Sequence, residues 1–176
     1  YSLATFVEQP DEELLDREEL DPDGALYKMY TTLEPSTWWN YQKKTRLWDD
    51  NSDIQELAAS ILLSGQALEE WLFDNINIPA VLAYTAATTV MNDNDHVHKN
   101  YYLYRDSDGD QEWQFLPWDK DLTMGRNYTT SGGVLNDSMW ATLDPQCHPL
   151  FGDRNHPKVD SSNFWNRLID ACYRVP

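Results

Sequence analysis

The sequence is poor in basic residues relative to acidic ones. It holds 13 Lys and Arg against 30 Asp and Glu, which gives a formal net charge of −17 over 176 residues. A surface this acidic repels phosphate backbones, so the charge argues against a nucleic-acid partner. It suits metal binding or an extracellular or salty setting, and solubility alone also explains it.

Long apolar runs are also missing. The longest stretch, residues 76–90, is broken by Asn77, Pro79 and three Thr, and a transmembrane helix needs about 20 apolar residues. Membrane insertion is therefore not expected. Cysteine is scarce as well, because only Cys147 and Cys172 occur. One disulfide and two free thiols both remain open.

The composition that is present fits one globular domain. It is 41% hydrophobic with eight Trp and ten Tyr, which indicates aromatic-rich packing. The chain opens at Tyr1 with alternating apolar residues, as if it entered in the middle of a strand. We therefore expect native segments ahead of Tyr1, and a signal peptide cannot be judged from this sequence.

Periodicity predicts an α+β domain. We expect strands over residues 1–8, 25–30, 100–105 and 112–118, and helices over residues 11–20, 51–64, 67–73, 78–91 and 164–173. Gly65 is expected to end the second helix. The helix over residues 78–91 is apolar all round, so it is expected to be buried at the centre. Residues 31–50 and 125–149 are expected to be irregular.

The stretch over residues 92–125 carries the clearest local signal. Asp108-Gly109 between two alternating runs predicts a β-hairpin. A turn centred there would place Tyr104 opposite Trp113 and Asn100 opposite Pro117. Four aromatic side chains would then share one face as hairpin core: Tyr102, Tyr104, Trp113 and Phe115.

The same hairpin would gather oxygen-bearing side chains at its open end. Asn100 and Asp119 would lie there on one face, Asp121 would follow at the same parity, and Asp95 comes five residues before Asn100. Such oxygens are the ligands of a hard cation and its phosphate. The turn acids fail the calcium-loop pattern, because Gly109 stands fourth in residues 106–110 instead of sixth.

Protein kinases use the same order of residues. In them, a catalytic-loop Asp orients the accepting hydroxyl. An Asn five residues later and an Asp after a short hairpin hold the magnesium that neutralises the transferring phosphate. Asp95, Asn100 and Asp119 reproduce this spacing. However, residues 92–94 are Asn-Asp-Asn where His-Arg would precede the Asp, and Asp-Lys-Asp replaces Asp-Phe-Gly. The chain is therefore not an ordinary protein kinase.

Three motifs together identify a closer match. They are Asn94-Asp95, the run KNYYLY over residues 99–104, and WQFLPWDKDLTMG over residues 113–125. With these motifs the sequence resembles the spore coat protein H (CotH) kinase-like family. Weaker similarities occur over residues 6–8, 26–28 and 148–151.

The resemblance implies the larger, mostly helical lobe of an atypical protein-kinase-like fold with a central β-hairpin carrying the metal-site residues. Residues 1–176 would be a single partial domain, with residues 1–8 as the last N-lobe strand and hinge and residues 9–176 as the C-lobe. It further implies ATP with Mg²⁺ or Mn²⁺, and phosphorylation of Ser or Thr on a protein substrate. It also leans towards an extracellular or cell-surface protein.

By motif position, Asp95 would orient or deprotonate the acceptor hydroxyl. Asn100 and Asp119 would hold the metal ion, and Asp121 would be a second ligand or a structural acid. The isolated chain is expected to be inactive, because it lacks the phosphate-covering loop and the phosphate-pairing Lys of the smaller lobe.

The expected cofactor contacts come from two other places. Main-chain groups of Phe6, Val7 and Glu8 would meet adenine, and Lys28 is an alternative phosphate contact. A competing interpretation keeps the fold without catalysis, as an acidic binding or coat-scaffold module that a metal stabilises. Asp95 would then cap a turn and Asn100 would be a strand-edge residue.

Overall fold

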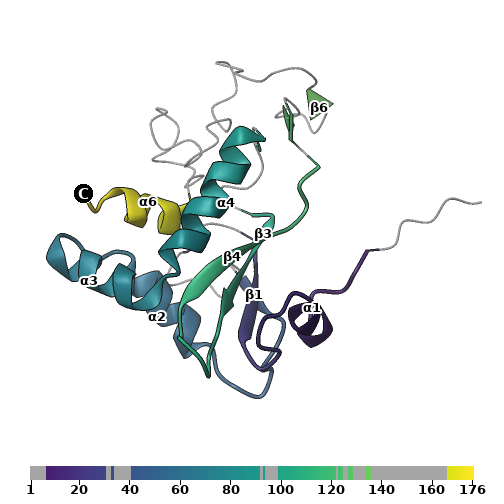
Figure 1. The fold of residues 1–176 in the computed structure, drawn as a ribbon, viewed down its shortest axis with the longest axis horizontal. Coiled ribbons are helices and arrows are strands. Elements are labelled where there is room, and N and C mark those ends of the chain that lie inside the picture. Colours follow the sequence, from purple (N-terminus) through teal and green to yellow (C-terminus); the bar gives the residue numbers. More distant parts are fainter. Residues whose placement is uncertain are drawn as a thin grey trace, which may run out of the picture.

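The fold is built around a four-stranded antiparallel sheet in the order β2-β1-β3-β4. Figure 1 labels three of its strands, β1, β3 and β4. The structure, a computed structural model, describes residues 7–30, 33, 41–91, 93, 99–121, 123–124, 127–128, 134–135 and 166–176. The strands are β1 (Ala25–Met29), β2 (Tyr41–Lys43), β3 (Tyr101–Arg105) and β4 (Trp113–Pro117). A separate two-stranded pair joins β5 (Asn127–Tyr128) and β6 (Val134–Leu135). The α+β prediction is confirmed.

Helices cover both faces of the sheet. They are α1 (Glu12–Arg17), α2 (Ser52–Ser60), α3 (Gln66–Asn75), α4 (Ile78–Val90) and α6 (Arg167–Tyr173). In Figure 1, α1 lies on one side of the sheet and the other four helices lie on the opposite side. Side-chain caps fix several helix starts: Asp11 accepts from the first turn of α1, and Asn77 and Asn166 do the same for α4 and α6.

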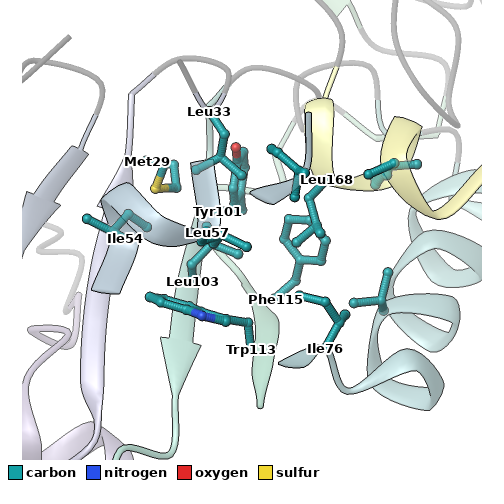
Figure 2. Packing of buried hydrophobic residues seen from close by; sticks show 14 of the residues in the cluster. Met29, Leu33, Ile54, Leu57, Ile76, Tyr101, Leu103, Trp113, Phe115 and Leu168 are labelled. Atoms are coloured by element: carbon teal, nitrogen blue, oxygen red, sulfur yellow. The ribbon is translucent and has the colours of Figure 1, made fainter. Parts of the chain in front are cut away.

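Two apolar clusters follow from this layering. The larger one packs Ala25, Tyr27 and Met29 of β1 with Tyr101, Leu103, Trp113 and Phe115 against α2, α3, α4 and α6 (Figure 2). The smaller one lies on the α1 side and contains Leu15, Leu26, Tyr102 and Tyr104. Alternate residues of each strand therefore bury on opposite faces, as the period of two requires.

The predicted hairpin exists, but its register is shifted by one residue. Tyr104 pairs with Gln114 and Arg105 with Trp113, instead of Tyr104 with Trp113. The side chain of Asp106 accepts from Gly109 N–H at 2.7 Å, and Asp110 accepts from Glu112 N–H at 3.0 Å. These two bonds close a connection over residues 106–112, one residue longer than expected. A one-residue slip exchanges the two faces.

The predicted aromatic face was therefore wrong. Tyr102 and Tyr104 bury towards α1, whereas Trp113 and Phe115 bury in the larger core. Phe115 there packs against Tyr101, with ring centroids 5.2 Å apart.

Other local predictions were wrong for reasons that the structure makes clear. Tyr41–Lys43 was expected to be irregular, but it pairs with β1 as β2. Gly65 precedes α3 with φ +60° instead of ending α2. Helix α4 is not buried all round: Leu82 is 58% exposed and Val90 is 82% exposed, because only one side of α4 meets the sheet. Residues 1–6 lie outside the described residues, and Val7 and Glu8 form no strand.

The two remaining sequence questions concern the membrane and the thiols. No described helix has the length and hydropathy to cross a bilayer. Cys172 is a free thiol packed beside the larger core, and burial raises its pKa to about 11. It therefore stays protonated and unreactive at neutral pH. Cys147 lies outside the described residues.

Gly24, just before β1, lies where a side chain has no room. A Cβ there would be 2.4 Å from Cε2 of Tyr104, a ring that is 2% exposed and whose hydroxyl accepts from Asp21 N–H at 3.0 Å. We expect Gly24→Ala to lower the free energy of unfolding by about 1–3 kcal/mol, as overpacking does. Urea denaturation measures this. Asp23→Ala, one residue away with an exposed side chain, is the control, and equal midpoints for the two variants would contradict the clash.

Candidate functional site

The open end of the β3–β4 hairpin carries two residues with left-handed backbone conformations. Asn100 has φ +62° and Asp119 has φ +54°. The last pair of the ladder is Tyr101 with Pro117, so Asn100 and Asp119 lie just beyond it at the same end. Asn and Asp enter this region more readily than other non-glycine residues, and such conformations gather at functional sites. The two residues therefore lie at the same end of the hairpin, as expected, but the register that predicted a common face for them was wrong by one residue.

The exposure of the residues after β4 alternates. Trp118 and Lys120 are partly buried, whereas Asp119 and Asp121 are exposed. Asn100 is 9% exposed. The two carboxylates therefore face solvent while the lysine between them turns towards the protein.

Lys120 meets a buried carboxylate. Its Nζ is 3.0 Å from Oδ2 of Asp93, which is fully buried, and it donates to the Tyr84 hydroxyl at 3.4 Å. Burial, and secondarily the charge of Asp93, raises the pKa of Tyr84 well above its ordinary value, so Tyr84 is a neutral phenol. A buried carboxylate is costly unless it is paired. This ion pair therefore ties the segment after the hairpin to the residue just beyond α4.

A backbone hydrogen bond ties the same two segments a second time. Met124 N–H donates to Met91 O at 2.8 Å. Met91 is the C-cap residue of α4, and Asp93 N–H donates to Thr88 O at 2.9 Å in the last turn of that helix. The end of α4 and residues 120–124 are thus held together at two points.

The candidate metal ligands are oxygen donors. The amide of Asn100 and the carboxylates of Asp119 and Asp121 have the hard-donor chemistry that Mg²⁺ and Mn²⁺ take. Within the described part of the chain, no group of three or more His, Cys, Asp or Glu side chains is placed to hold a metal ion. The candidate set that the sequence predicts combines the Asn100 amide with carboxylates. Asp95, the predicted catalytic residue, lies outside the described residues.

A cavity of about 500 Å³ opens beside this end of the hairpin, on the α1 side of the sheet. Its lining residues are Glu8, Leu14, Arg17, Glu18, Leu20, Gln114, Leu116, Pro117 and Trp118. Two of these lining residues, Glu8 and Arg17, form an ion pair. The cavity has the size of small-molecule sites and combines apolar walls with a few polar groups. One of the lining residues, Trp118, directly precedes Asp119 in the sequence.

Of the other predicted cofactor contacts, some lie at the cavity and others do not. Glu8 lines the cavity, Val7 is 65% exposed, and Phe6 lies outside the described residues. Lys28 is opposite Tyr102 in the sheet, and its Nζ is 5.7 Å from the centroid of the Trp118 ring. Lys28 therefore projects on the cavity side of the sheet, over a residue that lines the cavity.

The chain matches the model of a known protein family. The family described as CotH kinase protein matches residues 4–171, nearly the whole length. The chain belongs to the CotH kinase family. A comparison with curated proteins gave no match. Membership in the CotH kinase family indicates a kinase-like enzyme, and the α+β architecture with its antiparallel sheet is compatible with it.

Sequence analysis did not identify two residues of this CotH domain as part of the candidate site, Asp93 and Lys120. The sequence offered one indication of Lys120: a lysine enclosed by two aspartates directly after an apolar hairpin strand. Asp93 had no comparable signal, because it stands in a run of alternating Asn and Asp residues. Their contact joins segments on either side of β3 and β4.

Proposed function

We propose that this CotH kinase domain takes part in ATP- and divalent-metal-dependent phosphoryl transfer to Ser or Thr of a protein substrate. The observation that carries the proposal is a cavity whose lining reaches Trp118, the residue before Asp119 in the sequence. A nucleotide base in the cavity, against Trp118, would bring its phosphates towards the end of the hairpin where Asn100 and Asp119 lie. Family membership supports the reaction class.

The roles of the residues follow from their chemistry. Asn100 and Asp119 would hold Mg²⁺ or Mn²⁺, with Asp121 as a further oxygen ligand. The bound cation would offset the charge of the transferring phosphate. Asp95 would orient the acceptor hydroxyl and take up its proton. The neighbouring Lys120 turns inward to Asp93.

The base pocket would combine apolar contact with a polar edge. Leu14, Leu20 and Leu116 give apolar walls, and Trp118 offers an aromatic ring. The main chain of residues 6–8 would supply hydrogen bonds to the base. Lys28 would approach the phosphates from the same side of the sheet, where its ammonium already lies over the Trp118 ring.

The metal assignment is tested by Asp119→Ala in the full-length protein. The affinity for ATP is measured by calorimetry in Mn²⁺ and again in EDTA. The ratio of these two affinities is the metal-dependent gain in ATP affinity. We expect Asp119→Ala to reduce this gain at least tenfold, about 1.4 kcal/mol, because one charged ligand is lost. The variant should still fold, since the side chain is exposed, although alanine fits the left-handed backbone of residue 119 less well than aspartate does.

Asp108→Ala is the matched control for this experiment. Asp108 is also an exposed aspartate of the hairpin, with 69% of its side chain accessible, but it lies at the opposite end in the turn. Its metal-dependent gain should equal that of the wild type. Equal gains for all three proteins would rule out Asp119 as a metal ligand.

A further inference from the structure

We propose that Asp93 and Lys120 are positioning residues that hold Asp119 and Asp121 in the orientation needed for a divalent cation. This inference rests on the proposed function. Neither side chain would touch the cation or the nucleotide. Their ion pair would act through the backbone that carries the two candidate ligands.

The first step is the geometry of the segment. Lys120 is anchored inward at 3.0 Å from Asp93, and the residues on both sides of it are exposed carboxylates. Met124 N–H forms the second anchor, on Met91 O at 2.8 Å. Asp121 lies between the two anchors and Asp119 lies one residue before the first. Turning Lys120 inward therefore leaves both carboxylates facing outward.

The two side chains that Lys120 contacts, Asp93 and Tyr84, are held in place by the core. Asp93 is fully buried and its N–H is bonded to the last turn of α4 at Thr88 O. Tyr84, which receives the other contact from Lys120, stacks on Phe115 with ring centroids 4.7 Å apart. The base of the anchor is thus part of the packed core and cannot shift without cost.

The third step concerns the sign of the charge. A lysine between two candidate metal ligands repels a cation, so a simple electrostatic view expects tighter metal binding when it is removed. The positioning role gives the opposite expectation, because loss of the anchor lets both carboxylates leave their orientation. The two explanations therefore differ in the direction of the effect, not only in its size.

The test uses the full-length protein and three variants. Lys120→Met removes the cation, Asp93→Asn removes the buried carboxylate, and the double variant removes both and leaves the net charge unchanged. The double variant has no unpaired buried charge, so it stays folded where a single variant fails to fold. Lys44→Met is the control, because Lys44 Nζ donates to the exposed Gln42 side chain on β2, away from the ion pair between Asp93 and Lys120.

The first measurement needs no metal. Hydrogen exchange of the Met124 amide by NMR in the metal-free protein reports whether residues 120–124 stay attached to α4. We expect exchange at least tenfold faster in Lys120→Met and in the double variant, and no change in Lys44→Met. Wild-type exchange rates in the double variant would overturn the inference.

The second measurement is the Mn²⁺-dependent gain in ATP affinity. We expect at least a tenfold loss in Lys120→Met and in the double variant, although the double variant regains the wild-type melting temperature. The positioning role is overturned if the Mn²⁺-dependent gain in ATP affinity is unchanged or larger in Lys120→Met. It is also overturned if the double variant recovers the full wild-type gain. If the wild-type protein itself shows no Mn²⁺-dependent gain, the proposed function fails and this inference fails with it.

Discussion

Replacing Asp95 by asparagine is expected to lower phosphate transfer by about 10²–10⁴-fold, the usual contribution of a general base. Asparagine keeps the size of the side chain and one oxygen, but it cannot take up the proton of the acceptor hydroxyl. We propose this role for Asp95 because its spacing to Asn100 equals that of the kinase catalytic loop. Nucleotide and metal binding should persist, because the proposed ligands are Asn100 and Asp119.

The measurement is transfer of labelled γ-phosphate from ATP to an unstructured Ser- and Thr-rich protein by the full-length enzyme. Asp108→Asn is the control, since it makes the same chemical change in the exposed turn of the hairpin. We expect a loss in kcat with little change in KM for ATP in Asp95→Asn, and neither change in Asp108→Asn. Equal transfer by wild type and Asp95→Asn would favour the non-catalytic interpretation of the fold.

The hairpin shows what sequence alone can specify. Alternation and Asp108-Gly109 were enough to predict two strands and the turn between them, because both signals are local. The register was missed by one residue, because the side chains of Asp106 and Asp110 bond to backbone N–H groups and lengthen the turn. The faces of the aromatic residues followed the register and were missed with it.

The positions of two candidate residues were predicted in part, for a related reason. Asn100 and Asp119 were expected at one end of the hairpin, and the ladder places them there. Their expected common parity did not take account of positive φ at both residues, and such a backbone does not continue the alternation of a strand. A period of two predicts side-chain direction only within the regular strands, which begin at Tyr101 and end at Pro117.

Contacts between distant segments were beyond the sequence. The pairing of β1 with β3 depends on two strands that are separated by three helices along the chain. The Asp93–Lys120 ion pair likewise joins residues on either side of the hairpin. No periodicity records such pairings, because they depend on how the elements pack. The exposure of Leu82 on α4 has the same origin, since an apolar helix is buried only where another element covers it.

Removing the Phe115 ring is expected to have the largest effect on stability. Phe115 is 5% exposed and stacks on Tyr84, with ring centroids 4.7 Å apart and rings 15° from parallel. It also makes a T-shaped contact with Tyr101 at 5.2 Å, and Figure 2 labels Phe115 and Tyr101 in the core. We expect Phe115→Ala to lower the free energy of unfolding by about 3–5 kcal/mol, the range for large buried aromatics. The loss combines the apolar area with two aromatic pairs.

Phe73→Ala is the matched control, because Phe73 lies on α3 with 64% of its surface exposed. That change should alter the free energy of unfolding by less than about 0.5 kcal/mol. Chemical denaturation of both variants tests the difference, and similar midpoints would contradict the burial of Phe115 in the core.

Phe115 also supports Tyr84, which contacts Lys120, and Tyr101, which follows Asn100. A Phe115→Leu variant that folds should therefore bind Mn²⁺·ATP more weakly than wild type, because the packing beneath both halves of the candidate site is looser.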